Sequence, residues 1–310
     1  MKEWSRLGKR RRRKNYLGVL GHVNMDIIYR VPRLPSPGRS INAESVEIQF
    51  GGTAGNIAVH SARLGVPTAL GCYLGEDFDA SFSSLLNENA VDTYDAIICR
   101  SDRTPRCHIF DDGREQSYVI EQGAMDSTSE LPLWEHAVAD SSVVHVGTGD
   151  PRRYRRAVAG TDYNFDPGQE ISYRYAPGIF RELLSGCNIF FSNEKEIRTA
   201  LKLMSLKNEN ELADYCRTVL KTAGRKGTYV ITSDSSHVVR AASVEQLVDT
   251  IGAGDAFRAG FYAALYRKKD MISAVQIGNT MAAMSLSGKG GISQSVSWEN
   301  LLLRWKDEYG

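Results

Sequence analysis

The sequence predicts an α/β domain with a doubly wound, mostly parallel sheet flanked by helices, and a small β-sheet lid. Short runs that are apolar throughout alternate with helical patterns, as expected of strands that are buried on both faces of a parallel sheet. Two segments, 27–50 and 95–121, interrupt this alternation and have the pattern of hairpin strands, with a turn at Asp111-Asp112-Gly113. We expect these two segments to form the lid.

The strands and helices follow one another along the chain in a regular order. The first strand, Tyr16–Gly21, ends in glycine. A glycine pair, Gly51-Gly52, precedes a helix over Asn56–Leu64, which Gly65 ends. This series predicts one large domain over residues 15–310. Its further members are a helix at Asp77–Asn89 and strands at Ala69–Leu74, Ser142–Gly147, Asp162–Asp166, Asn188–Ser192 and Thr228–Thr232.

Charge separates residues 1–14 from the rest of the chain. They hold eight Lys or Arg and one Glu, whereas the remainder holds 30 Lys or Arg and 36 Asp or Glu. We expect a basic, disordered start, and an arm that binds nucleic acid is the alternative. The mildly acidic body argues against nucleic acid as the main ligand.

Composition narrows the class and the compartment. Of the 310 residues, 42% are hydrophobic and 24% charged, which is typical of a globular protein. No run approaches the roughly 18 consecutive apolar residues of a membrane span, and no apolar segment follows the basic start as in a secretion signal. The five cysteines lack a metal-binding spacing, as expected of thiols in a reducing compartment. We therefore expect a cytoplasmic protein without a membrane partner.

The run Asp249–Asp255 carries the strongest chemical signal. It reads Asp-Thr-Ile-Gly-Ala-Gly-Asp, and a helix of small and apolar residues follows. Gly252 and Gly254 permit a tight turn whose N–H groups would point at one place at the helix N-terminus, which suits a phosphate or an oxyanion. Asp255 would lie beside this anion hole and could accept the proton of an attacking hydroxyl. The alternative is a plain turn with Asp255 as a helix cap.

This run and a second one resemble the signatures of the ribokinase-like (PfkB) kinases. Asp249–Asp255 is similar to the second signature of that family, DTxGAGD, and residues 51–58 (GGTAGNIA) are similar to the first, GGxxxNxA. The resemblance covers nearly the whole chain from Tyr16 onward. It implies a kinase that moves the γ-phosphate of ATP to a hydroxyl group of a small molecule.

The resemblance also implies a role for each motif. The second signature would supply the general base and the anion hole. The first signature and the aspartate after the first strand would bind the acceptor, although a glycine hinge followed by a helix cap is the alternative for the first signature. The implied residues are Asp255, Gly252, Ala253 and Gly254 for catalysis, and Asp26, Gly51, Gly52 and Asn56 for the acceptor.

A further resemblance concerns the cations. Asn193-Glu194-Lys195-Glu196 is similar to the NxxE motif of the family. This implies that Glu196 holds Mg²⁺ through its water shell and that Asn193 lies near the nucleotide phosphates. A capped helix start is the alternative, and it is compatible with the first interpretation. Relatives also place a monovalent cation such as K⁺ near the anion hole.

The nucleotide loop of the family, TxGxxG, follows a late strand. After Thr228–Thr232 the chain reads Ser-Asp-Ser-Ser-His and has neither glycine. We therefore expect an altered loop, in which Thr232 and Ser233 contact the phosphates or the ribose of ATP.

Three other runs resemble the archaeal nucleoside-kinase branch of the family. They are Thr104-Pro105-Arg106, Val146–Pro151 and Phe165–Gln169. This implies that the acceptor is a ribonucleoside phosphorylated at its 5′-hydroxyl. Asp166 and Gln169 follow a predicted strand at the end where ligands of parallel sheets bind, so Asp166 could contact Mg²⁺ and Gln169 the nucleotide. A polar loop without a ligand is the alternative for both.

Two other functions remain open from the sequence. The first is a kinase of a free sugar or sugar acid (ribose, fructose or 2-keto-3-deoxygluconate), since Arg106 on the lid could meet a carboxylate. The second is a non-catalytic ligand-binding regulator on the same fold, because the altered loop could mean that nucleotide binding was lost. The resemblance further implies a homodimer formed through the lid.

Overall fold

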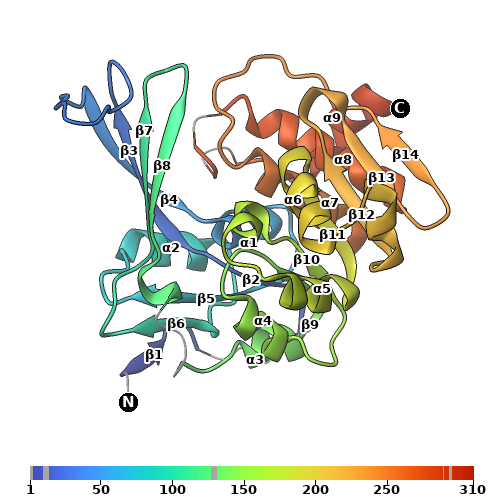
Figure 1. Ribbon diagram of the computed structural model, residues 1–310, viewed down its shortest axis with the longest axis horizontal. Coiled ribbons are helices and arrows are strands. Elements are labelled where there is room, and N and C mark those ends of the chain that lie inside the picture. The colour runs from blue at the N-terminus through green and yellow to red at the C-terminus, as the bar shows by residue number, and fades with distance from the viewer. Residues whose placement is uncertain (1–2, 10–13, 127–130, 289, 293–294) are drawn as a thin grey trace.

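The computed structural model describes residues 3–9, 14–126, 131–288, 290–292 and 295–310. Its larger sheet has ten strands, and neighbouring strands run parallel except in the first pair and the last two (Figure 1). The mostly parallel α/β class is thus confirmed. In the order in which they pair, the strands are β1 (Trp4–Arg6), β6 (Ala96–Cys99), β5 (Thr68–Gly75), β2 (Asn15–Leu20), β9 (Ser141–Val146), β10 (Tyr163–Phe165), β11 (Cys187–Asn193), β12 (Thr218–Thr222), β13 (Thr228–Ile231) and β14 (Ser236–Val239).

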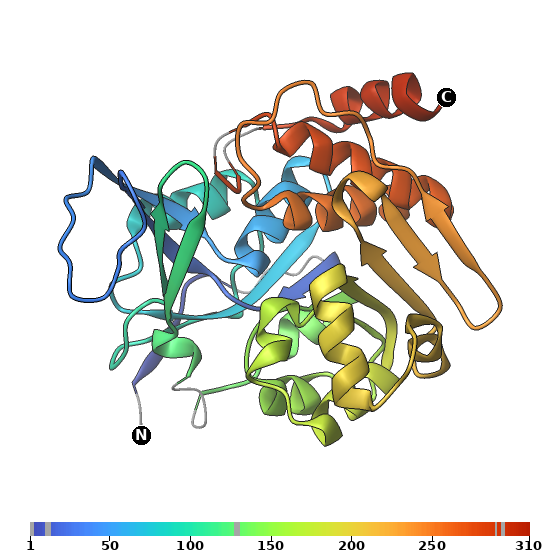
Figure 2. The ribbon, with the colours of Figure 1, turned by 45° about the horizontal axis from the view of Figure 1, so that its top comes forward.

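Helices cover both faces of the larger sheet (Figure 2). Apolar side chains bury a separate core under each layer, so the sheet strands are apolar on both sides. One layer consists of α1 (Thr53–Arg63), α2 (Ala80–Glu88), α7 (Ala253–Tyr266), α8 (Met271–Ser285) and α9 (Trp298–Tyr309). The other consists of α3 (Glu135–Ala139), α4 (Pro151–Ala157), α5 (Pro177–Ser185) and α6 (Glu194–Met204), with short 3-10 turns η1 (Gly123–Met125), η2 (Gly168–Ser172), η3 (Glu209–Asp214) and η4 (Gly224–Lys226) elsewhere in the chain.

A smaller sheet stands off the domain at the left of Figure 1. Its strands, in pairing order, are β4 (Ser45–Gly51), β3 (Asn24–Arg30), β7 (Arg106–Asp111) and β8 (Gln116–Glu121). This is the expected lid sheet, but the start of its second segment at residue 95 is wrong. Ala96–Cys99 pairs with β5 in the larger sheet, because its mostly buried side chains require cover on both faces.

The beginning of the chain is more ordered than the sequence suggested. β1 pairs antiparallel with β6, and Arg6 forms an ion pair with Asp95. The carboxylate of Asp95 is buried and needs a cation, which explains why a basic segment docks here. The expectation of a disordered start is therefore wrong for Trp4–Arg6, while residues 1–2 and 10–13 lie outside the described residues.

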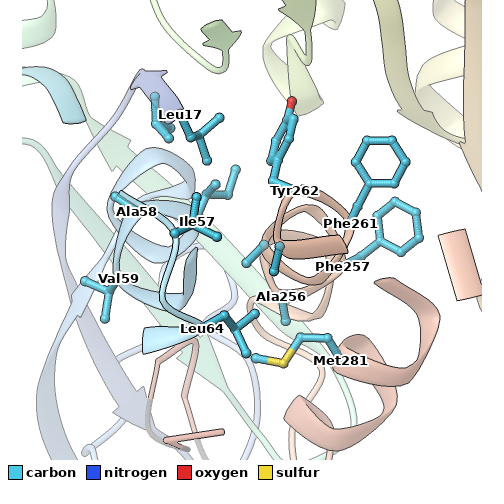
Figure 3. Packing of buried hydrophobic residues seen from close by; sticks show 14 of the residues in the cluster. Leu17, Ile57, Ala58, Val59, Leu64, Ala256, Phe257, Phe261, Tyr262 and Met281 are labelled. Atoms are coloured by element: carbon cyan, nitrogen blue, oxygen red, sulfur yellow. The ribbon is translucent and has the colours of Figure 1, made fainter. Parts of the chain in front are cut away.

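Close packing in the first helical layer brings two helix starts together. Figure 3 shows Ile57 of α1 and Leu64, just after α1, next to Ala256 of α7; all three side chains are almost fully buried. The small side chain of Ala256 lets the two helices approach each other.

Within the described ranges, every helix is too short or too polar to cross a membrane.

Glycines allow α7 and α8 to lie equally close. A Cβ atom added to Gly260 of α7 would lie 2.7 Å from Cβ of Met281, and one added to Gly278 of α8 would lie 2.8 Å from the ring of Phe257. Both distances are too short for real side chains, so these glycines set the spacing of the two helices.

We predict opposite effects for the same substitution at two helical glycines. Gly278→Ala is expected to lower the free energy of unfolding by about 1–3 kcal/mol, because the added methyl group overpacks the contact with Phe257. Gly178→Ala in α5 is the matched control, since its Cβ would meet nothing within 4 Å. It is expected to raise stability by up to about 1 kcal/mol, because alanine favours the helix. Urea unfolding measures both, and equal effects would contradict the close packing.

Candidate active site

A cleft of about 760 Å³ is lined by residues of both sheets. The lid contributes side chains from β3, β7 and β8, and the first helical layer contributes the starts of α1 and α7. Five parallel strands of the larger sheet also reach the cleft with residues at or just after their C-terminal ends, which is where ligands of such sheets bind. These residues are His22, Thr148, Asp166, Asn193 and Thr222, which follow or end β2, β9, β10, β11 and β12.

The start of α7 forms the predicted glycine turn. Gly252 has a φ of +75°, and a Cβ atom on it would lie 2.6 Å from Cα of Gly291, so this position requires glycine. The first N–H groups of the helix have no partner within it and point toward its positive end. Gly252, Gly254 and Asp255 line the cleft, and Ala253 lies between the two glycines in the same first turn.

Asp255 is bound by the start of α1. Its Oδ2 atom accepts a hydrogen bond of 2.8 Å from Nδ2 of Asn56. The other amide atom, Oδ1 of Asn56, is buried and has no hydrogen-bond partner among the described residues. Since Asn56 also lines the cleft, this oxygen is available to accept a hydrogen bond from a ligand hydroxyl.

The acceptor residues predicted around Asp26 are brought together at the base of the lid. Nδ2 of Asn24 donates to Oδ1 of Asp26 at 2.5 Å. A Cβ atom on Gly51 would lie 2.1 Å from Oδ2 of Asp26, and one on Gly52 would lie 2.5 Å from the carbonyl oxygen of His22. The glycine pair therefore lets the backbone approach the carboxylate closely. Asp26 and Gly52 line the same cleft as Asp255, and Gly51 lies against Asp26.

Burial sets the acidity of these two carboxyl groups. It raises the pKa of Asp255 to about 7; the charge of Asp166 adds to this effect, while the Asn56 hydrogen bond and Arg258 oppose it. Burial likewise raises the pKa of Asp26 to about 7, against the hydrogen bond from Asn24 and with a contribution from Asp255. A carboxylate with such a pKa is a stronger base near neutral pH than an exposed aspartate.

Asp166 forms a buried ion pair that sequence analysis did not foresee. Its oxygens accept hydrogen bonds of 2.5 and 2.9 Å from Nε and Nη2 of Arg258. Burial alone would raise the pKa of Asp166, but the Arg258 guanidinium and His145 hold it at about 2. The magnesium contact of Asp166 stays a prediction, and it would require this carboxylate to leave Arg258. Gln169 lines the cleft nearby.

Asn193 and Glu196 form the capping box that was the alternative interpretation of their motif. Oδ1 of Asn193 accepts from the N–H groups of Lys195 and Glu196, and Oε2 of Glu196 accepts from the Asn193 N–H at 2.8 Å. Both side chains nevertheless line the cleft. Burial raises the pKa of Glu196, and the charge of Asp166 adds to it.

The described residues contain no cluster of three or more His, Cys, Asp or Glu that could hold a metal ion. The cleft offers instead the carboxylate of Glu196. This donor set fits Mg²⁺, which keeps several of its waters and is bound by few carboxylates together with substrate phosphates.

The TxGxxG spacing expected of the nucleotide loop occurs one strand earlier than predicted. β12 ends in the cleft at Thr222, and Thr222-Ala223-Gly224-Arg225-Lys226-Gly227 has the TxGxxG spacing. Gly224 and Gly227 have φ values of +54° and +94°. Thr232 and Ser233 lie instead in the turn between the antiparallel strands β13 and β14 and do not belong to the cleft lining.

The strand before this loop was missed because Lys221 interrupts its apolar pattern. The ammonium group of Lys221 lies 2.5 Å from Oε1 of Glu209 and 3.8 Å from the ring centroid of Tyr229. These partners, which belong to η3 and β13, allow a lysine in a buried strand. The glycine spacing itself was a usable signal in the sequence.

The chain is similar to known kinases along most of its length. The model of the pfkB family carbohydrate kinases matches residues 14–298. The nucleoside kinase of Methanocaldococcus jannaschii is 28% identical over 294 residues, which cover 92% of this chain and 95% of that protein. The ribokinase of Haemophilus influenzae is also 28% identical over 294 residues, or 89% of this chain and 94% of that protein.

The structural comparison agrees. The crystal structure of the M. jannaschii nucleoside kinase, an archaeal member of the ribokinase family, has a TM-score of 0.87 at 26% identity and covers 96% of this chain and 100% of that one. The Burkholderia thailandensis nucleoside kinase in complex with inosine has a TM-score of 0.85 at 19% identity, with coverage of 95% and 99%, and supports the fold. Since the family model spans most of the residues, this chain belongs to the pfkB family of carbohydrate kinases.

Proposed function

We propose that this chain is an ATP-dependent kinase that phosphorylates a ribonucleoside at its 5′-hydroxyl. The observation that carries the proposal is the placement of Asp255, a buried carboxyl at the positive end of α7 that shares one cleft with Asp26 and Asn56. The similarity to the M. jannaschii nucleoside kinase over nearly the full length of both chains supports the choice of acceptor.

In this proposal the ribose is held from the side of the lid. The carboxylate of Asp26 and the free Oδ1 of Asn56 accept hydrogen bonds from the sugar hydroxyls, and the Gly51-Gly52 backbone lets the ring approach. The 5′-hydroxyl then faces Asp255. Its oxygen attacks the γ-phosphorus as the bond to the departing ADP oxygen breaks, and its proton passes to Asp255. The N–H groups at the start of α7 stabilise the charge on the transferred group.

The cations and the partner chain are proposed on separate grounds. Glu196 would hold Mg²⁺ through its waters, and the ion would supply neutralisation of the phosphate charge. The K⁺ site near the anion hole stays a prediction.

The homodimer is supported by exposed apolar side chains on the outer face of the lid sheet. Ile48 and Val119 lie in one row of paired residues across the four strands, and their side chains are 62% and 58% exposed.

A free sugar is the second candidate acceptor, because the H. influenzae ribokinase is as similar in sequence as the nucleoside kinase. A sugar acid is less well supported, since Arg106 forms an ion pair of 2.5 Å with Asp77 and does not belong to the cleft lining. The regulator alternative rested on a missing nucleotide loop, and the run 222–227 removes that basis.

We predict that the purified full chain, with ATP and Mg²⁺, releases ADP with inosine, cytidine or adenosine. Turnover with ribose, fructose and 2-keto-3-deoxygluconate is expected to be much lower, since these compounds lack a base. A coupled ADP-release assay over all six compounds measures this. Turnover on a free sugar alone would overturn the nucleoside assignment and keep the kinase, whereas turnover on none would contradict both.

Replacing the proposed base should slow the chemical step and leave nucleoside binding nearly unchanged. Asp255→Asn is expected to lower kcat by about 10² to 10⁴, while the dissociation constant of the nucleoside changes little. Asp270→Asn, at the cap of α8 outside the cleft, is the matched control and should keep full activity. Single-turnover kinetics and calorimetric titration separate the two effects, and near-native turnover in Asp255→Asn would remove Asp255 from the base role.

Loss of folding is not expected to explain the lower kcat of Asp255→Asn. The folded pKa of Asp255 is about 7, above its ordinary value of 3.8, so ionising this group costs stability as pH rises between these values. The asparagine avoids that cost. Asp255→Asn is therefore expected to be at least as stable as the wild type above pH 7, as measured by thermal unfolding.

The pH dependence of kcat/KM should reflect the ionisation of two carboxyl groups, those of Asp255 and Asp26. Burial raises the pKa of both Asp255 and Asp26 to about 7, and both must be ionised to act. We expect kcat/KM for the nucleoside to fall below about pH 7 with a logarithmic slope between about 1 and 2. Asp26→Asn should return the slope to about 1 at a higher KM. A wild-type profile that stays flat down to about pH 5 would contradict this assignment.

A further inference from the structure

A chain of polar side chains lines one wall of the cleft and takes no part in the proposed phosphoryl transfer. Its members come from four separate segments: His22 after β2, Gln122 after β8 of the lid, Thr148 after β9, and Glu170 in η2. All four line the cleft. Each is bound to the next, so the wall is built as one unit.

Glu170 determines the direction of every hydrogen bond in this wall. Its carboxylate can only accept, so the atom of Gln122 that lies 3.2 Å from it must be the amide nitrogen. The amide oxygen of Gln122 then faces Nε2 of His22 at 2.7 Å. Nε2 must therefore carry the proton of this ring, and Nδ1 accepts from the Thr148 hydroxyl at 2.8 Å.

Arg174 and Tyr173 bind the carboxylate of Glu170, and the imidazole of His22 stays neutral. Nε of Arg174 lies 3.0 Å from Oε1 of Glu170, and the Tyr173 hydroxyl donates to the same oxygen at 3.3 Å. Burial lowers the pKa of His22, so a second proton on the ring is disfavoured near neutral pH. The polarity of the wall is thus fixed by the ion pair of Arg174 with the buried carboxylate of Glu170.

One N–H of the Gln122 amide has no hydrogen-bond partner among the described residues. Its oxygen is used by His22 and one amide N–H by Glu170, and no other hydrogen bond of this side chain exists among the described residues. Gln122 is half-buried and lines the cleft, so its second N–H is available there. The wall therefore presents a donor and cannot rotate this amide to present an acceptor.

The wall adjoins the acceptor site. The Thr53 hydroxyl, one residue after Gly52, lies 2.9 Å from that of Thr148. Ile120 of the lid and Tyr173 also line the cleft. Ile120 is an apolar side chain two residues before Gln122, and Tyr173 offers an aromatic ring whose hydroxyl donates to Glu170. A planar ring with an acceptor atom on its edge suits such surroundings, whereas the sugar hydroxyls are donors for Asp26 and Asn56.

We propose that Gln122 determines acceptor specificity by donating a hydrogen bond to a carbonyl oxygen or ring nitrogen of the nucleobase, with Glu170 as the positioning residue that fixes its amide. This inference rests on the proposed function, because it requires a base attached to the ribose. Gln122 contacts the substrate without taking part in the chemistry, and Glu170 acts through Gln122.

The test compares Gln122, just after β8, with Gln116, at the start of the same lid strand. Gln122→Met keeps the size of the side chain and removes the donor, and is expected to raise KM for inosine about tenfold or more with kcat and the KM for ATP little changed. Any turnover of ribose should be unaffected, since ribose has no base. Gln116→Met is the matched control: Gln116 also donates to a carboxylate, that of Asp111, but does not line the cleft.

A second variant tests the positioning role. Glu170→Gln keeps the volume but no longer fixes the orientation of the Gln122 amide, so KM for inosine should rise severalfold while KM for ATP stays the same. An inosine KM within about twofold of the wild type in Gln122→Met, or an equal rise in Gln116→Met, would overturn the inference. If the wild type phosphorylates only free sugars, the proposed function itself has failed, which the same assay reveals before any variant is compared.

Discussion

The ion pair between Asp166 and Arg258 is the interaction on which the geometry of the active site depends. It links the end of β10 to α7, and both side chains are more than 90% buried. Desolvating two charges is costly, so such a pair is tolerated only when its remaining groups also find partners. Here Nη1 of Arg258 donates to the carbonyl oxygen of Gly254 at 3.0 Å, and Nε2 of His145 lies 3.5 Å from Asp166. The pair therefore fixes the turn that carries the proposed anion hole.

The same pair influences the base that follows the turn. Arg258 lies three residues, or nearly one helical turn, beyond Asp255, and its positive charge lowers the pKa that burial raises. Asp166 opposes this effect but is itself neutralised by the bidentate contact. Without the arginine, a buried Asp255 facing Asp26 and Asp166 would hold its proton more tightly. A dry site that needs a carboxylate base near neutral pH thus also needs a buried cation close to it.

The sequence was sufficient for features that are local in the chain. The turn at Gly252, the helix start that carries the proposed base Asp255, and the glycine pair at Gly51-Gly52 each lie within one short run. Features that depend on partners in other helices or strands were missed. Arg258 stands in an apolar helix, and its partner is 92 residues away. Lys221 hid the strand β12, and with it the nucleotide loop, because its partners Glu209 and Tyr229 belong to other elements.

Two ion pairs at the cleft, Asp166–Arg258 and Arg174–Glu170, each orient a neighbouring polar group. At one end of the cleft, Arg258 of the Asp166–Arg258 pair donates to the carbonyl oxygen of Gly254. At the other wall, Glu170 of the Arg174–Glu170 pair accepts from the amide of Gln122. In each case the carboxylate of the pair is buried, and the group that the pair binds belongs to a residue that lines the cleft. Since a carboxylate can only accept and a guanidinium can only donate, each pair removes the freedom of its neighbour to reorient. Buried charge in this fold therefore acts chiefly to orient neutral groups around the acceptor, and the lid completes both ends by supplying Asp26 to one and Gln122 to the other.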